Sequence, residues 1–488
     1  MSIVKVENLT FAHLGSYDNV FENVNFVLDT DWKLGFVGRN GRGKTTFLNL
    51  LLGKYPYQGK IISSVQFDYF PYTVEADCKV TLDVLEQICP TAQDWQFYKE
   101  LNSLDVDASD VLYRQFKTLS KGEQTKVLLA ALFLNEGHFL LIDEPTNHLD
   151  LQARQVVSRY LRGKKGFILV SHDRQFLDGC VDHILSLNRA NIEVQKGNFS
   201  SFMTNFDNRQ KFELTQNARL QSEIANLRQA AARTAGWSQK VEQTKTGAFD
   251  SGYVGHKSAK MMQRAKAIEY RQQKAIEEKS QLLKNTETAE PLKIHSIPYR
   301  AETLVSLENV SISYGDKVVC SNISFDIKRG ERVALSGKNG SGKSSIIKLI
   351  LQVFPPHVGK IQIGSGLKVS YVSQDTSGLC GKLREFASAH GVDESLFLTI
   401  LRKLDFSREQ FDKDLKDFSA GQKKKVLIAK SLCEQAHLYI WDEPLNYIDV
   451  YSRMQIEQLL CDFKPTMLFV EHDGAFRDLV ATKVVELN

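Results

Sequence analysis

The sequence lacks the features that place a protein in or across a membrane. None of its apolar runs approaches the roughly 18 to 20 residues that cross a bilayer. The first residues, MSIVKVENLTF, show no basic stretch followed by an apolar one, which is the pattern of a secretory signal. We therefore expect a cytoplasmic protein.

Cysteines are few and scattered. There are seven, an odd number, and none belongs to a C-x-x-C pair: Cys78, Cys89, Cys180, Cys320, Cys380, Cys433 and Cys461. This distribution argues against a disulfide framework and against a zinc site. We expect these thiols to be reduced and buried.

The composition is that of an ordinary globular protein. The chain has 488 residues, of which 42% are hydrophobic and 25% are charged, with a net charge of +4. This length accommodates two or three domains, so internal duplication is the first property to test.

Two stretches match the phosphate-binding loop pattern G-x-x-x-x-G-K-[ST]. Each follows an apolar, strand-like run and precedes an apolar helical pattern. Such a loop wraps phosphates in backbone N–H groups, its lysine supplies a positive charge, and its hydroxyl coordinates Mg²⁺. The candidate ATP ligands are Gly38, Asn40, Gly41, Gly43, Lys44, Thr45 and Thr46 in the first loop, and Gly337, Asn339, Gly340, Gly342, Lys343, Ser344 and Ser345 in the second.

The segments that follow the two loops repeat with the same spacing. The serine of LSKGEQ, and likewise that of FSAGQK, lies 76 positions after the lysine of the preceding loop. The glutamate of HFLLIDEP or HLYIWDEP then follows this serine after 24 positions. A histidine follows that glutamate after 28 positions in one half and 29 in the other. The chain is therefore a duplication with an offset near 299.

This order of motifs resembles the ABC ATPase superfamily along essentially the whole chain. A phosphate loop, an S-x-G-[EQ] signature, a hydrophobic-D-E-P segment and a His-Asp turn occur twice. A pair of unrelated P-loop kinases explains neither the signature nor the shared order. The resemblance implies an α/β fold with two P-loop ABC nucleotide-binding domains.

The resemblance also assigns roles at each site. Asp143 and Asp442 are expected to hold Mg²⁺ together with Thr45 and Ser344. The neighbouring carboxylates Glu144 and Glu443 are expected to be the general bases that orient the attacking water. His172 and His472 resemble the histidine that contacts the γ-phosphate.

The resemblance implies that the two domains of one chain pack head to tail in a monomer. One ATP would lie between Lys44 and the second signature, and the other between Lys343 and the first, because the N-terminus of a signature helix attracts phosphate. The signature candidates are Ser120, Gly122, Glu123, Ser419, Gly421 and Gln422. Tyr314 is positioned to stack on adenine in the second half, and His13 aligns with it in the first.

The two halves depart from the family pattern in different ways. The second half has Gln374 where the family places a metal- and water-binding glutamine, whereas the first half has Tyr72. The second half has Ala420 in its signature, Leu445 and Tyr447 after its Asp-Glu pair, and Glu471 before its histidine. Equal activity of the two sites does not follow from the sequence.

The connector between the halves is expected to be a helical hairpin. Residues 205–285 show two helical stretches separated by a glycine-containing segment. They hold 15 basic and 8 acidic residues, a charge of +7, which leaves −3 for the rest of the chain. A basic face with aromatic residues suits RNA, although a solvated coiled-coil face shows the same pattern. The expected domains are 1–204, the linker 205–298 with its tip at 245–255, and 299–488.

Two complete nucleotide-binding domains joined by a charged helical linker resemble the ABC-F family. The phrases GRNGRGKTT, DEPTNHLD and GHKSAKMMQRAK look most like its branch that confers resistance to lincosamides, streptogramin A and pleuromutilins. The resemblance implies binding to the bacterial ribosome, both its RNA and P-site tRNA, with the linker tip approaching the peptidyl-transferase centre. The implied tip contacts are Lys245, Phe249, Tyr253, Lys257 and Lys260.

Other readings remain. A transporter ATPase can hold two fused nucleotide-binding domains, but the long basic hairpin disfavours a membrane partner. DNA-organising ATPases place a coiled coil inside one such domain rather than between two. A general translation factor that rescues stalled ribosomes stays as the alternative to a resistance protein.

Overall fold

The computed structural model describes residues 2–13, 19–74, 80–135, 137–147, 149–187, 192–243, 292–315, 317–353 and 355–487, with 268, 270 and 274. Met1–Ser200 and Ala289–Asn488 together form one compact unit, and Ser201–Thr288 forms another. We call 1–200 the first half and 289–488 the second half.

Each half is built on a parallel sheet of buried strands. Runs such as FILV and LYIW hold no charged residue, and every position in them is buried because both faces of these strands are covered. In the first half the strand order is β5 (Gln66–Phe70), β6 (His138–Asp143), β7 (Phe167–Val170), β3 (Lys33–Gly38), β8 (His183–Leu187) and an antiparallel β9 (Ile192–Lys196). In the second half it is β14 (Val369–Val372), β15 (Leu438–Asp442), β16 (Met467–Val470), β12 (Arg332–Gly337) and β17 (Lys483–Leu487).

A three-stranded antiparallel sheet accompanies each parallel sheet. Its strands are β2 (Phe21–Asp29), β1 (Ile3–Phe11) and β4 (Gln58–Ser63) in the first half, and β11 (Lys317–Lys328), β10 (Thr303–Tyr314) and β13 (His357–Ile363) in the second. Side chains from both sheets and from the helix after the phosphate loop form a core in each half, and helices α11 to α15 pack on the parallel sheet of the second half in a further core. In the first core the ring of Phe47 lies 5.5 Å from that of Phe36 and 6.0 Å from that of Phe21.

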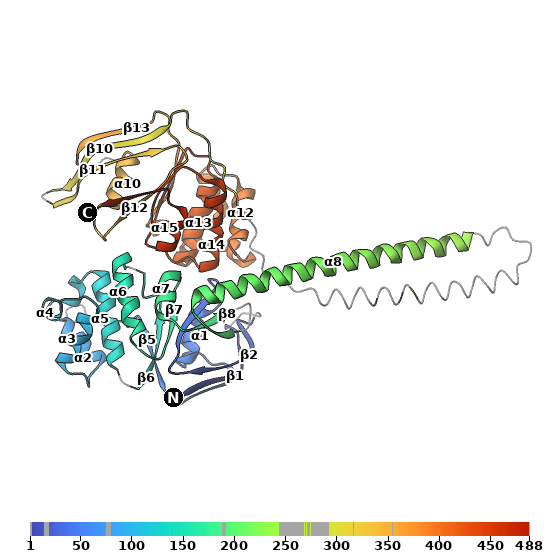
Figure 1. Cartoon of the computed structure of the whole chain (residues 1–488), viewed down its shortest axis with the longest axis horizontal. Helices are drawn as coiled ribbons and strands as arrows, with labels where there is room; N and C mark the ends of the chain where they lie inside the picture. Colours follow the sequence, from blue (N-terminus) through green and yellow to red (C-terminus); the bar gives the residue numbers. More distant parts are fainter. Residues whose placement is uncertain are drawn as a thin grey trace, which may run out of the picture. The chain divides into compact units, whose positions relative to one another are not determined.

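Helices complete each half. Figure 1 shows α2, α3, α4 and α5 gathered at one end of the first half, away from strands β1 and β2. The first half has α1 (Lys44–Leu51), α2 (Thr81–Ile88), α3 (Asp94–Ser103), α4 (Ala108–Val111), α5 (Lys121–Leu134), α6 (Leu151–Arg162) and α7 (Arg174–Cys180). The second has α10 (Lys343–Ile350), α11 (Leu383–Ala389), α12 (Glu394–Lys403), α13 (Ala420–Cys433), α14 (Val450–Phe463) and α15 (Gly474–Val480).

The connector begins with one long helix, α8 (Phe199–Gln243), drawn in green in Figure 1. Ile224 is buried on it, and Leu220 and Leu227 are half-buried, whereas the neighbouring positions 221, 222, 225 and 226 are exposed. These three apolar residues lie on one side of the described part of α8. The predicted tip, residues 245–255, and most of the predicted second arm lie outside the described residues. No helix in the described ranges has an apolar stretch long enough to span a bilayer.

The thiols follow the prediction only in part. Cys89, Cys180 and Cys320 are buried and unbridged. The expectation of burial was wrong for Cys380, which is exposed in the loop before α11, and Cys433 and Cys461 are only half-buried. Burial of these side chains depends on how the loops and helix ends pack, which their sequence spacing does not record.

Candidate functional site

The phosphate loops connect a central strand to a helix in both halves. β3 leads into α1 and β12 leads into α10, so the loop lysines are the first residues of their helices. Gly43 and Gly342 precede them with φ of 100° and 91°. A Cβ on Gly43 would lie 2.5 Å from Val20 Cγ1, so both conformation and space require glycine there.

Both lysine ammonium groups are anchored to their own loops. Lys44 Nζ donates to the carbonyl of Gly38 at 2.7 Å, and Lys343 Nζ donates to that of Gly337 at 2.8 Å. Burial lowers the pKa of both lysines, although nearby carboxylates oppose this shift. A buried cation at a helix N-terminus is the arrangement expected for a phosphate site.

A hydroxyl and a carboxylate meet beside each lysine. Thr45 Oγ1 donates to Asp143 Oδ2 at 3.1 Å, and Ser344 Oγ donates to Asp442 Oδ2 at the same distance. The second carboxylate oxygen, Asp442 Oδ1, is buried without a hydrogen-bond partner among the described residues. Hard oxygen ligands with spare coordination capacity fit Mg²⁺. The described residues contain no group of three or more His, Cys, Asp or Glu that would indicate another kind of metal site.

The glutamates that follow these aspartates adopt an unusual backbone conformation. Glu144 and Glu443 have φ of 51° and 48°, in the left-handed region that non-glycine residues seldom occupy. Each N–H donates to the end of the neighbouring strand, at Val170 or Val470. The strained turn brings each carboxylate to a histidine: Glu144 Oε1 lies 3.2 Å from His172 Nε2, and Glu443 Oε1 lies 3.4 Å from His472 Nε2.

The two glutamates differ in their electrostatic surroundings. Burial, and next the Asp143 carboxylate, raise the pKa of Glu144 to about 8. Burial also acts to raise the pKa of Glu443, but hydrogen bonds from His472 and Gln374 outweigh it and lower that pKa below its ordinary value. Burial and then Lys44 lower the pKa of His172 well below its usual range, so its imidazole is neutral at neutral pH.

The Gln374 amide contributes to the lowered pKa of Glu443, after His472. Gln374 Nε2 donates to Glu443 Oε2 at 2.9 Å, and Asn446 Nδ2 donates to the same oxygen at 2.6 Å. Tyr72 occupies the place of Gln374 in the first half and is exposed. Glu144 Oε1 is buried and makes no hydrogen bond within the described part of the chain, despite its short distance to His172. Asn446 belongs to none of the motifs, although Asn147 stands at the corresponding position of the first half, 299 residues earlier.

The signature serines cap their helices. Ser120 is the N-cap of α5, where its Oγ accepts from Glu123 N at 3.2 Å and its own N donates to Glu123 Oε2 at 2.7 Å. Ser419 and Gln422 repeat this capping box on α13, at 3.3 and 2.9 Å. The signature residues therefore fix a helix N-terminus in each half, where the backbone dipole favours an anion.

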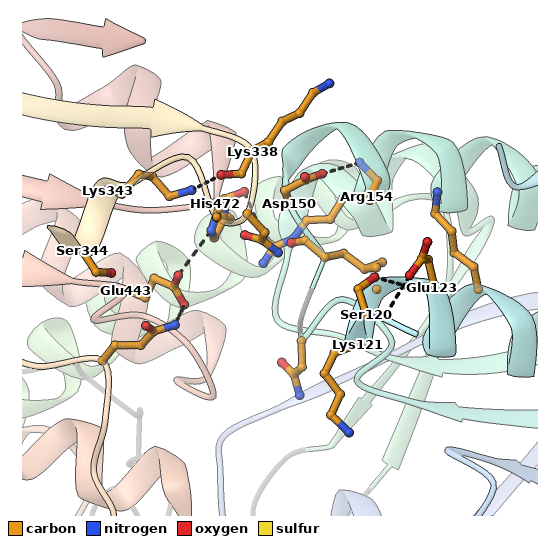
Figure 2. A pocket seen from close by; sticks show the side chains of 18 of the residues that line it. Ser120, Lys121, Glu123, Asp150, Arg154, Lys338, Lys343, Ser344, Glu443 and His472 are labelled. Carbon is orange, nitrogen blue, oxygen red and sulfur yellow. Dashed lines mark hydrogen bonds and ion pairs between the residues drawn. The ribbon is translucent and has the colours of Figure 1, made fainter. Parts of the chain in front are cut away.

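One cavity of about 950 Å³ combines the second phosphate loop with the first signature. Figure 2 shows Lys343, Ser344, Glu443 and His472 entering it from the second half, opposite Ser120 and Glu123 of the first. The cavity is also lined by the predicted residues Asn339, Gly340, Gly342, Ser345, Gly122, Gln374 and Tyr314. The structure thus brings together the residues that the resemblance assigns to one composite ATP site.

The first phosphate loop also lies against the opposite half. Asn40 Nδ2 donates to the carbonyl of Tyr447 at 2.6 Å. A Cβ on the signature residue Gly421 would lie 2.4 Å from that carbonyl oxygen and 3.0 Å from Asn40 Nδ2, which explains why glycine occupies the position. Arg39 lies 3.5 Å and Arg42 3.6 Å from Asp405, a residue that sequence analysis did not identify.

The two candidate adenine residues lie at the ends of equivalent strands. Tyr314 ends β10, is 46% exposed, and its hydroxyl lies 3.4 Å from Ser345 Oγ. His13 follows β1, and its ring lies 5.0 Å from that of Phe11 and 6.1 Å from that of Tyr55. The predicted tip residues Lys245, Phe249, Tyr253, Lys257 and Lys260 lie outside the described residues.

Buried ion pairs lie next to the residues of the two sites. Arg154 donates to Asp173 at 2.9 Å and to the carbonyl of His472 in the opposite half at 3.1 Å. Lys425 donates to Asp449 at 2.8 Å, and both side chains are buried. The motifs did not single out these residues, although Asp150 and Arg154 recur at the 299-residue offset as Asp449 and Arg453.

Comparison with known proteins gives a consistent result. The profile of the family described as "ABC transporter" matches residues 21–147 and 320–446. The ribosome protection protein VmlR of Bacillus subtilis is 30% identical over 94% of this chain and 82% of its own length. The putative ATP-binding protein YdiF of Bacillus subtilis is 27% identical over all of this chain and 80% of its own.

Solved structures agree at the level of the fold. An archaeal ribosome recycling factor, aABCE1, aligns with a TM-score of 0.65 at 20% identity, covering 98% of this chain and 87% of that one. A structure titled RNase-L Inhibitor aligns with a TM-score of 0.63 at 20% identity and the same coverage. With the profile matching once in each half, the chain belongs to the ABC transporter family and contains two of its ATP-binding cassettes.

Proposed function

We propose that the chain hydrolyses ATP at two composite sites, each formed by the phosphate loop of one half and the signature of the other. The observation that supports this most directly is the cavity that holds Lys343 and Glu443 together with Ser120. The helix N-terminus at Ser120 faces the lysine across a space large enough for a nucleotide. ATP bound there would contact both halves, so hydrolysis would weaken their association.

The proposed reaction is the displacement of ADP by water. The water oxygen bonds to the γ-phosphorus, the bond from that phosphorus to the β–γ bridging oxygen breaks, and ADP and inorganic phosphate result. Glu443 orients the water and accepts its proton, while Lys343 and His472 lie around the γ-phosphate. Glu144, Lys44 and the neutral imidazole of His172 are the corresponding groups of the other site.

Bound Mg²⁺ would neutralise charge on the phosphate oxygens. Thr45 with Asp143, and Ser344 with Asp442, are the pairs that would hold it. Each hydroxyl already lies at hydrogen-bond distance from its carboxylate, so little rearrangement is required to bring both oxygens to one ion.

We propose further that the protein is an ABC-F ATPase that binds the bacterial ribosome in the cytoplasm and protects it from drugs acting at the peptidyl-transferase centre. Two observations support this. A relative that is 30% identical along most of both chains is named a ribosome protection protein. The connector holds the excess positive charge of the chain and begins with α8, a helix of 45 residues. A basic helical extension is suited to ribosomal RNA.

The first test is co-sedimentation of the Glu144→Gln, Glu443→Gln double variant with purified bacterial ribosomes. Glutamine keeps the shape of each side chain but cannot accept the proton, so ATP stays bound. We expect ATP-dependent pelleting of this variant and none of a Lys44→Ala, Lys343→Ala control. Pelleting that is independent of ATP, or absent, would contradict the proposal.

Drug protection is tested separately. A strain that lacks the protein is expected to become more sensitive to lincosamides, streptogramin A and pleuromutilins. Unchanged sensitivity combined with ATP-dependent ribosome binding would favour a general translation factor.

A further inference from the structure

The two composite sites hold their general bases differently. Glu443 Oε2 accepts from Gln374 and Asn446, while Glu144 Oε1 is buried without a hydrogen bond within the described residues. We infer that the site of Lys343 and Glu443 hydrolyses ATP rapidly, and that the site of Lys44 and Glu144 retains ATP through several cycles of the other. This inference rests on the proposed ATPase function.

The amide donors matter because a general base acts only from a defined orientation. The two bonds to Glu443 Oε2 come from side chains on different segments, one in the loop after β14 and one in the turn after β15. They fix the plane of the carboxylate and leave Oε1 beside His472. A prealigned carboxylate pays little reorientation entropy when water is bound, which favours proton transfer.

Within the part of the first site that the structure describes, no amide donor takes the place of Gln374. The register of β5 with β6 and of β14 with β15 places Tyr72 at the position of Gln374, and Tyr72 is exposed. A phenol cannot provide an amide N–H. In addition, Tyr69 OH donates to Asp143 Oδ2 at 3.0 Å, on the oxygen that already accepts from Thr45. Asp143, the carboxylate expected to bind Mg²⁺ in the first site, therefore accepts a hydrogen bond from Tyr69 in addition to the hydroxyl bond that Asp442 accepts in the second.

A buried lysine connects two segments of the second site by hydrogen bonds. Lys424 Nζ donates to the carbonyl of Ser373, which precedes Gln374, at 2.8 Å, and to that of Asp442 at 3.3 Å. One cation thus ties the glutamine segment to the strand that ends in the Asp-Glu pair. At the corresponding position of the first half, Thr125 donates to Lys121 O of its own helix at 2.9 Å. Among the residues placed by the structure, Thr125 therefore forms no hydrogen bond that joins the Tyr72 segment to β6.

The test is a chemical-quench experiment on the full chain with ribosomes. Protein loaded with two molecules of α-labelled ATP is mixed with Mg²⁺, quenched at intervals, and the ADP formed per chain is counted. We expect a fast phase with an amplitude of one ADP per chain, followed by a phase at least about ten-fold slower. Glu443→Gln should remove the fast phase, lowering its rate at least about a hundred-fold, and Glu144→Gln should remove the slow one.

Exchange of the differing residues supplies the matched control. Gln374→Tyr should slow the fast phase about ten-fold, the effect of losing one hydrogen bond to a charged group, with less change in the KM for ATP. Tyr72→Phe should leave both phases unaltered, because the Tyr72 hydroxyl has no role in this proposal.

The outcomes separate the two proposals. A single phase of two ADP per chain, or equal losses from Glu144→Gln and Glu443→Gln, would overturn the inequality of the sites and leave the ATPase function standing. A fast phase that depends on Glu144 would reverse the assignment and so overturn it. Absence of turnover in the unmodified chain would overturn both the inequality and the ATPase function.

Discussion

Replacement of Asp449 by asparagine isolates the contribution of one buried ion pair. Asp449 is the N-cap of α14, where it accepts from Ser452 N at 3.0 Å, and it also accepts from Lys425 Nζ at 2.8 Å. Asparagine caps helices as well as aspartate does, so the cap is kept and the counter-charge is lost. The asparagine side chain has one oxygen, which accepts from Ser452 N in the cap, so its NH2 group faces the Lys425 ammonium.

The expected loss follows from the burial of the pair. The two side chains are 5% and 0% exposed, so Lys425 would remain as a buried charge. The carbonyl of Leu404, at 2.9 Å, would then be its hydrogen-bond acceptor among the described residues. Removing one partner of a buried pair costs about 3–5 kcal/mol of unfolding free energy. For the second half unfolding by itself, residues 289–488, that lowers Tm by about 6–20 °C.

The control is the equivalent residue of the first half. Asp150 caps α6 and accepts from Ala153 N at 2.9 Å, but no residue in the described ranges forms an ion pair with this aspartate. Asp150→Asn should therefore cost less than about 1 kcal/mol. The second control is Asp449→Asn combined with Lys425→Met, which removes the stranded charge and should recover at least half of the loss.

Fluorescence distinguishes the halves in the unfolding assay. Trp441 is fully buried on β15, so a chain with phenylalanine at Trp32, Trp95 and Trp237 reports the second half and serves for Asp449→Asn. A chain with phenylalanine at Trp95, Trp237 and Trp441 reports the first half through Trp32, which stacks on His183, and serves for Asp150→Asn. Urea titrations at pH 7.5 give the free energies. A loss from Asp449→Asn no larger than that from Asp150→Asn, or no recovery in the double variant, would refute the reasoning.

The same pair predicts a pH dependence. Burial acts to raise the pKa of Asp449, but Lys425 outweighs it and holds that pKa far below its ordinary value. A depressed pKa stabilises the fold above the unfolded value, about 3.9, and the contribution is lost as pH falls below it. The unfolding free energy of the unmodified chain should therefore exceed that of Asp449→Asn by a constant amount from pH 8 to about 5. Below about pH 4 this difference in free energy should become smaller.

Two further predictions concern buried carboxylates near the site. Arg174→Ala leaves Glu457 of the opposite half buried without its cation and should lower the unfolding free energy by about 3–5 kcal/mol. Adding Glu457→Gln to the same chain should restore at least half of that loss. Calorimetry measures both variants, and a double variant no more stable than Arg174→Ala would contradict this prediction. Glu471→Ala strands the N–H of Leu445, which it binds at 2.7 Å, and should cost about 1–3 kcal/mol in the Trp441 assay. Glu471→Gln keeps an acceptor, so a loss as large as that of the alanine variant would argue against the hydrogen bond.

Local patterns in the sequence determined the halves and their sites. Glycine spacing predicts the phosphate loops because only particular backbone shapes expose N–H groups to phosphate, and apolar runs predict the parallel strands. The equal spacing from Lys44 to Ser120 and from Lys343 to Ser419 identified the duplication before any contact was known. The capping boxes at both signatures are likewise readable from S-x-x-E and S-x-x-Q.

Only the tertiary structure decided which groups meet across the chain. Asn40 and Tyr447 are separated by 407 positions, and no periodicity reports such a contact. The donors on Glu443 come from separate segments, and whether Asn446 points to that carboxylate depends on how the left-handed turn is packed. Side-chain direction and burial are set by neighbours distant in sequence, so the difference between the two bases became visible only when the strands and turns were assembled.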